Sequence, residues 1–149
     1  MMKRIIGCGN LLLKDEGIGV HLIEYLKRQP LPEGVELVDG ATGGFDLIPF
    51  IEDAQEVIIV DAVQAGGTPG AVYRFTPEDF ETAAAPGTSL HDVTLKDIFH
   101  IIQLKRPLPP VVIFGVEPQE ISWGMELTDA VRNGLPALAG MVIKELEHA

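Results

Sequence analysis

The fold of this chain is decided by one stretch near its start, Gly7-Cys8-Gly9-Asn10-Leu11-Leu12-Leu13-Lys14-Asp15-Glu16-Gly17-Ile18-Gly19-Val20. It follows an apolar run and leads into residues with helical spacing, so it predicts a tight turn from a strand into a helix. Glycine is used where the backbone has a positive φ or where another segment approaches closely. Asp15 and Glu16 suit the start of a helix, because carboxylates there interact favourably with the helix dipole. Carboxylates at the carboxyl end of a strand also suit a metal or acid–base site.

A nucleotide-binding turn is the alternative interpretation of this stretch, and it is disfavoured. Gly7 and Gly9 supply the first two glycines of a dinucleotide fingerprint, but Leu12 stands where the third is required. No Gly-Lys-Ser/Thr follows, so the Walker pattern is missing as well. Two adjacent carboxylates would also repel a pyrophosphate placed at this turn.

Length and charge narrow the class of protein. The 149 residues predict one domain, residues 1–149, with a sizeable core. The chain has 22 acidic and 11 basic residues, a formal net charge of −11, which argues against binding nucleic acid or anionic membranes. Cys8 is the only cysteine, so no internal disulfide can form, and we expect it to be a small buried group. Without a long apolar run or a signal h-region, we expect a cytoplasmic protein. We also expect a monomer.

Apolar runs predict the strands. Strands are expected at residues 3–8, 35–39, 57–60 and 111–116, and all of them except 35–39 are expected to be buried. Residues 71–75 alternate between apolar and polar side chains, which is typical of an antiparallel or edge strand.

Helical spacing predicts four helices between these strands. They cover residue 17 to about residue 29, 45–53, 94–105 with Thr94 as the N-cap, and 128–147 with a kink or break at Pro136. The alternation of strands and helices predicts an α/β fold. We expect a single-domain three-layer sandwich in which helices flank a twisted, mainly parallel sheet.

Candidate site residues follow the predicted strands. Glu16 comes after the first strand, Asp39 ends the second and Asp61 ends the third, while a long loop delivers His91. The carboxyl ends of parallel strands share one edge, where ligands bind. Carboxylates and an imidazole could there hold a divalent transition metal, with water or substrate completing its coordination. Asp39 could equally be a turn residue, and His91 could help to cap the next helix.

With these residues in place, the sequence resembles the nickel–iron hydrogenase maturation proteases. Residues Gly9 to Gly19 fit the opening motif of that family, G-N-x-L-x-x-D-[DE]-G-x-G. Further matches follow in the expected order along nearly the whole chain: Asp39-Gly40-Ala41-Thr42-Gly43, Val60-Asp61-Ala62, Pro69-Gly70, Ser89-Leu90-His91, Gly115-Val116-Glu117-Pro118, Gly124 and Leu127-Thr128. Two departures are small: Ala41 stands where the family often has glycine, and Thr128 where serine is common.

The resemblance implies an endopeptidase that removes a short C-terminal extension from a hydrogenase large-subunit precursor. It implies that Glu16, Asp61 and His91 bind nickel, with Asp39 close by. In this family the nickel belongs to the precursor, although other divalent metals could occupy the site. We therefore expect Glu16, Asp61 and Asp39 to be catalytic, and either the metal or a carboxylate base to activate water.

Two other functions remain open at this point. A self-sufficient metallopeptidase would carry its own metal and cleave unrelated peptides. A non-catalytic chaperone would bind the nickel-loaded precursor without cutting it.

Overall fold

The computed structural model describes residues 2–80 and 90–147. Its strands are β1 (Lys3–Cys8), β2 (Val35–Ala41), β3 (Glu56–Ala62), β4 (Val72–Phe75) and β5 (Val111–Val116). Its α-helices are α1 (Ile18–Leu26), α2 (Ile48–Glu52), α3 (Leu90–Gln103), α4 (Asp129–Arg132) and α5 (Leu135–Glu147). Three short 3₁₀ helices are η1 (Lys14–Gly17), η2 (Gly44–Leu47) and η3 (Pro77–Phe80).

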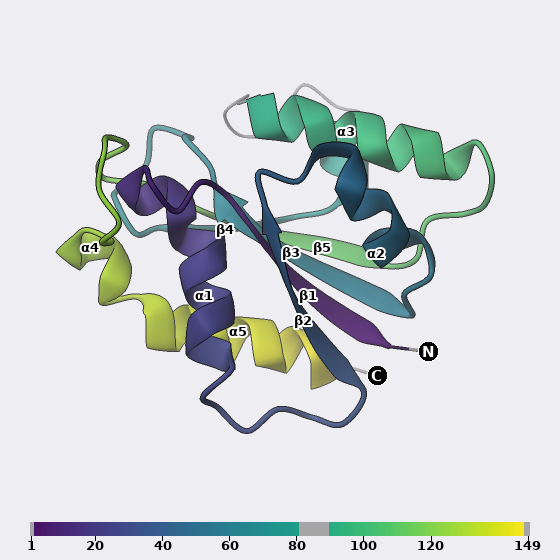
Figure 1. The fold of residues 1–149 in the computed structure, drawn as a ribbon, viewed down its shortest axis with the longest axis horizontal. Helices are drawn as coiled ribbons and strands as arrows, with labels where there is room; N and C mark the ends of the chain where they lie inside the picture. The colour runs from purple at the N-terminus through teal and green to yellow at the C-terminus, as the bar shows by residue number, and fades with distance from the viewer. Residues whose placement is uncertain (1, 81–89, 148–149) are drawn as a thin grey trace.

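The five strands form one sheet in the order β2-β1-β3-β5-β4. All neighbouring pairs are parallel except β4 with β5, which is antiparallel (Figure 1). The continuous apolar strands occupy the centre because both of their faces are covered, whereas the alternating β4 lies at an edge. The predicted α/β sandwich and the antiparallel edge strand are confirmed.

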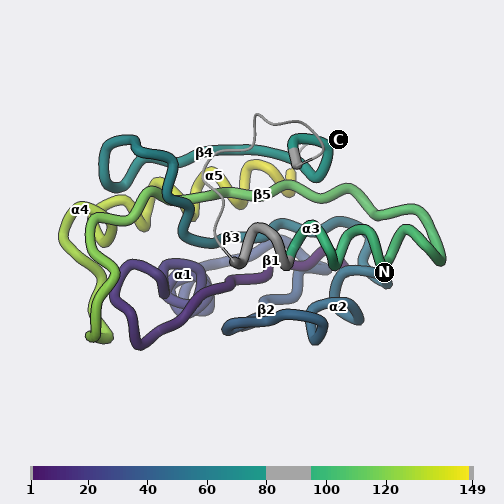
Figure 2. Tube along the Cα trace, turned by 90° about the horizontal axis from the view of Figure 1, so that it is seen from above, coloured from purple at the N-terminus to yellow at the C-terminus, as the bar shows by residue number. Residues whose placement is uncertain are grey.

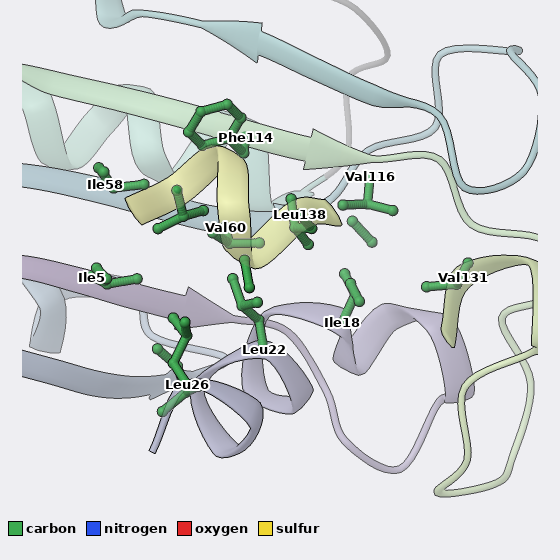
Figure 3. Close-up of a cluster of buried hydrophobic side chains, with 14 of the residues drawn as sticks. Ile5, Ile18, Leu22, Leu26, Ile58, Val60, Phe114, Val116, Val131 and Leu138 are labelled. Atoms are coloured by element: carbon green, nitrogen blue, oxygen red, sulfur yellow. The ribbon is translucent and has the colours of Figure 1, made fainter. Parts of the chain in front are cut away.

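Helices cover both faces of the sheet and enclose two apolar cores. Helices α1 and α5 lie on one face, and α2 and α3 lie on the other (Figures 1 and 2). Alternate residues of the central strands point into opposite cores: Ile5, Ile58 and Val60 pack with α1 and α5, and Ile6, Val57 and Ile59 pack with α2 and α3. Figure 3 shows the first of these cores, which combines Leu22 and Leu26 of α1, Leu138 of α5 and residues of the central strands such as Ile58 and Val60.

The opening turn works through two glycines that allow close backbone approach. A Cβ on Gly19 would lie 2.3 Å from the Val60 carbonyl oxygen and 2.4 Å from that of Cys8, so α1 could not lie this close to β1 and β3 with any side chain there. Gly9 has φ +128°, a conformation that residues other than glycine rarely adopt. A Cβ there would lie 1.8 Å from the Glu16 carbonyl oxygen. The glycines therefore set the path of the chain from strand to helix.

Helix boundaries are where the structure departs most from the expectations. Helix α1 ends at Leu26, three residues before the expected end, and Lys27 to Gln29 form turns. Helix α3 begins at Leu90 rather than Thr94, so Thr94 is not an N-cap and His91 lies in the first helical turn, not in a loop. The mostly polar residues from 91 to 94 concealed this start, because they lack the apolar spacing that is typical of an amphipathic helix.

The closing helix is broken, as Pro136 suggested. Helix α4 ends at Arg132 and α5 begins at Leu135, with Asn133 and Gly134 between them. Pro136 is the second residue of α5, where a missing N–H costs no helical hydrogen bond. In the part of the chain that the structure describes, none of the helices has the length and apolar character required to cross a bilayer.

Candidate functional site

Asp61 is the central residue of the candidate site. It is the penultimate residue of β3, the middle strand of the sheet, and its side chain is 1% exposed. Its Oδ1 accepts a hydrogen bond of 2.8 Å from the Ala62 N–H. It lines a small cavity on the α3 side of the sheet together with Cys8, Leu47, Leu95 and Ile98, among others. A carboxylate thus stands in an apolar wall at the carboxyl end of the sheet.

Glu16 is brought to the same place by the opening turn. It lies in η1, is half-buried, and its backbone carbonyl passes directly over Gly9. A Cβ on Gly9 would lie 1.8 Å from that carbonyl oxygen and 3.5 Å from Oδ1 of Asp61. Gly9 is therefore the spacer between the Glu16 backbone and the Asp61 carboxylate, and any larger residue would push the two apart.

Asp39 lies on the other side of β1. It pairs in register with Gly7 and is exposed, and strand alternation directs it away from the face on which Val38 is buried. Its Oδ1 accepts a hydrogen bond of 2.9 Å from the Ala41 N–H. Ala41 has φ +45°, in the left-handed region. The carboxylate thus stabilises a turn, and its expected catalytic role stays a prediction.

His91 is placed only by its backbone. It lies one helical turn before Leu95, which lines the cavity beside Asp61, but the side chain of His91 lies outside the described part of the structure. Among the side chains that the structure describes, no three from His, Cys, Asp or Glu are grouped closely enough to hold a metal ion. The predicted ligand set of Glu16, Asp61 and His91 therefore stays a prediction.

Cys8 lies beside Asp61 but is not poised as a nucleophile. Burial raises the pKa of its thiol well above the usual value, and the charges of Asp61 and Asp39 raise it further. A neutral thiol is a poor nucleophile. The expectation that Cys8 is a small buried group is confirmed.

Asp15 has a larger role than the helix-dipole interaction expected from the sequence. It is completely buried in η1 and accepts hydrogen bonds from three backbone N–H groups and one hydroxyl. Its Oδ2 accepts from Gln119 N at 2.8 Å, Glu120 N at 3.1 Å and Thr128 Oγ1 at 2.7 Å, while Oδ1 accepts from Thr128 N at 2.9 Å. Burial raises the pKa of Asp15, but these hydrogen bonds outweigh it and lower the pKa below its ordinary value. The charged side chain therefore fastens the loop after β5 to the turn that carries Glu16.

Glu117 fastens a second loop at the same end of the sheet. Its Oε1 accepts hydrogen bonds from Ala65 N and Gly67 N, both at 2.9 Å, and from the Tyr73 hydroxyl at 2.7 Å. Burial again raises the pKa, and the hydrogen bonds from Tyr73 and the loop lower it below its ordinary value. Asp15 and Glu117 thus anchor the two loops that frame the carboxyl end of β3 and β5.

Comparison with known proteins identifies the family. The sequence profile of the hydrogenase maturation protease family matches residues 20–145. The chain belongs to this family.

Named relatives agree with this assignment. The hydrogenase expression/formation protein HupD of Rhodobacter capsulatus is 34% identical over 146 residues, covering 95% of this chain and 70% of that protein. The hydrogenase 2 maturation protease of Escherichia coli is 32% identical over 148 residues, covering 97% of this chain and 90% of that protein. The solved structure of the hydrogenase maturating endopeptidase HybD from E. coli superposes with a TM-score of 0.86 at 28% identity, covering 98% and 92% of the two chains. The resemblance seen in the sequence is confirmed.

The structure also explains motif residues to which the sequence assigned no role. Asp15, Glu117 and Thr128 all stand in the segments that matched the family pattern, yet none was a site candidate. The sequence feature that could have revealed them is a charged or polar residue next to a buried strand or a turn. Their function in this structure is to hold loops in position around Glu16 and Asp61.

Proposed function

We propose that this chain is the endopeptidase that removes the C-terminal extension from a nickel-loaded [NiFe] hydrogenase large-subunit precursor. One observation carries the proposal: a buried carboxylate, Asp61, ends the central strand and lies 3.5 Å from the Cβ position of Gly9, beneath the Glu16 backbone. An acidic group in this position suits metal recognition at the edge of a parallel sheet. Family membership supports the peptide-hydrolysing activity.

In the proposed mechanism, nickel is part of the substrate. Glu16, Asp61 and His91 contact the nickel of the precursor, and this contact positions the scissile peptide beside the carboxyl end of the sheet. Either that metal or a carboxylate among Glu16, Asp61 and Asp39 activates the attacking water. Cys8 takes no covalent part, because its thiol stays protonated.

The test is a cleavage assay on a large-subunit precursor, prepared with and without nickel and followed by intact mass. We expect loss of a C-terminal peptide from the nickel-loaded form alone. Asp61→Asn and His91→Ala should abolish cleavage, while Asp53→Asn, an exposed carboxylate at the opposite end of the sheet, should cleave at the wild-type rate.

The other results separate the competing functions. Tight binding without cleavage would favour a chaperone. Equal cleavage of both forms, together with metal retained by the purified enzyme, would favour a self-sufficient metallopeptidase. Normal cleavage by folded Asp61→Asn protein would overturn the assigned role of Asp61.

A further inference from the structure

A group of exposed apolar side chains lies beside the candidate site. We call it the rim patch, and it consists of Leu12, Ile121, Trp123 and Met125, all exposed, with Trp123 at 80%. The two segments that carry it are joined directly: Gly124 N donates to Leu12 O at 2.9 Å, and Lys14 N donates to Gly124 O at 2.8 Å. Figures 1 and 2 show the loop after β5 running alongside the segment before α1. The backbone hydrogen bonds therefore bring the segment that carries Leu12 beside the segment that carries the other three residues.

The rim patch is held by a rigid support. Asp15 binds the backbone of the loop at Gln119, Glu120 and Thr128, and Lys14 Nζ forms a 2.9 Å ion pair with Glu120. These contacts fix the backbone of the loop, while the four apolar side chains stay between 38% and 80% exposed. An adjoining group of exposed apolar residues is typical of an interaction site. A surface that is already ordered also loses less conformational entropy when it binds.

A pocket beside the rim patch offers a place for an apolar side chain. It has a volume of about 250 Å³ and is lined by His21, Met125, Glu126, Leu127, Arg132 and Leu135. Met125 belongs both to the pocket and to the rim patch, so the two surfaces are continuous. Tryptophan and methionine next to a pocket are the residue types enriched at protein–protein contacts.

Charge indicates what kind of segment would bind. The exposed carboxylates around the rim patch are Glu120, Glu126 and Asp129. Lys14 pairs with Glu120 and Arg132 pairs with Asp129, so one negative charge is left in excess here. The whole chain has a formal net charge of −11. A basic partner would approach this surface faster and more selectively than an acidic one.

We propose that the rim patch docks an extended segment of the precursor protein that combines apolar and basic residues. The proposal rests on the proposed function for the identity of the partner. Docking at Trp123 holds the precursor against the loop that Asp15 fastens to the Glu16 turn, and so beside the candidate site. The rim patch contributes to binding of the precursor and not to the chemical step.

The first experiment uses the single tryptophan of the chain as a reporter. Asp61→Asn protein is labelled with 5-fluorotryptophan and titrated with the nickel-loaded precursor, so that the ¹⁹F spectrum contains only Trp123. We expect its resonance to shift as the complex forms. We also expect the difference in its chemical shift between H₂O and D₂O, which reports solvent exposure, to become smaller. An unchanged resonance in a complex that sedimentation shows to be formed would overturn the proposal. A shift that grows with protein concentration without precursor would also overturn it, because a second copy would then cover the patch.

The second experiment measures steady-state cleavage. Trp123→Ala should raise KM at least about tenfold with kcat within about twofold, the effect of losing a binding hot spot. Trp123→Phe should recover most of the loss. Leu104→Ala is the matched control, because Leu104 is 85% exposed and follows α3 at the far end of the sheet; its KM should not change.

These outcomes separate the docking surface from the proposed function. Cleavage by the wild type with an unaltered KM in folded Trp123→Ala protein would overturn the docking surface and leave the peptidase assignment intact. A response of the Trp123 resonance to a precursor that the wild type does not cleave would support docking and overturn the peptidase assignment.

Discussion

The two ends of the sheet are stabilised in different ways. The carboxyl end contains Asp15, Asp61 and Glu117, which are the buried charged residues among the side chains that the structure describes. The amino end instead uses a partly exposed arginine, Arg4, which pairs with Glu36 and Asp53 on the surface. Exposed ion pairs contribute little to stability because water solvates and screens the charges. Buried carboxylates are costly unless hydrogen bonds satisfy them, and they then hold their partners firmly.

Backbone strain follows the same division. Lys14 and Ala41 are the non-glycine residues with positive φ in the described part of the chain. Both lie at the carboxyl end of the sheet, Lys14 as the first residue of η1 and Ala41 as the last residue of β2. Such conformations cost free energy and persist where the surrounding contacts impose them, commonly at functional sites. The carboxyl end therefore combines strain with strong anchoring, as expected of an edge that must present side chains in a fixed geometry.

The largest effect should come from Asp15→Ala. The replacement removes the acceptor of three backbone N–H groups and one hydroxyl, and we expect it to lower the free energy of unfolding by about 3 kcal/mol. Urea denaturation followed by circular dichroism measures this loss. Glu36→Ala, which breaks an ion pair of Arg4 at the amino end, is the control and should cost less than about 1 kcal/mol. Equal losses would show that the two ends do not differ.

Glu117→Gln should have the next largest effect. The amide keeps one acceptor oxygen but loses the charge that strengthens the hydrogen bonds from Ala65, Gly67 and Tyr73, so we expect a loss of about 2 kcal/mol. Tyr73→Phe removes one of these donors and should cost about 1 kcal/mol. Because the two residues interact, the double variant should lose less than the sum of the single losses. Strict additivity would argue against a shared network.

Lowering the pH should destabilise the protein through the two hydrogen-bonded carboxylates at the carboxyl end of the sheet. Hydrogen bonding lowers the folded-state pKa of Asp15 below 3.8 and that of Glu117 below 4.5, although burial opposes both shifts. A lowered pKa adds stability that is fully present above the unfolded pKa and is lost as pH falls through the folded value. We therefore expect the free energy of unfolding to fall below about pH 4.5. The double variant Asp15→Asn/Glu117→Gln, less stable at neutral pH, should show a flatter acid dependence, and an unchanged slope would contradict this origin.

Sequence reasoning found the elements whose signal is local. The apolar runs predicted β1, β3 and β5, and Asp61 was conspicuous because a charged residue ends such a run. The start of α3 was wrong because the polar residues after Leu90 interrupt the helical pattern. The role of Asp15 was missed for a different reason. Its partners lie 104 to 113 residues away, and no local pattern reports such contacts.

Ala41 offers the smallest and most local test of strain at the carboxyl end. Its φ of +45° costs an alanine roughly 1–2 kcal/mol, which glycine would not experience. Glycine makes the unfolded chain more flexible, at a cost of about 0.4–1 kcal/mol. Ala41→Gly should therefore raise the free energy of unfolding by about 0.5 kcal/mol, measurable as a small rise in Tm. Ala130→Gly is the matched control, because this exposed alanine lies in α4 and has no positive φ, so it should lose about 1 kcal/mol. A loss of the same size in both variants would mean that the turn after Asp39 stores no strain, and that the hydrogen bond from Ala41 N–H to Asp39 holds the backbone without opposition.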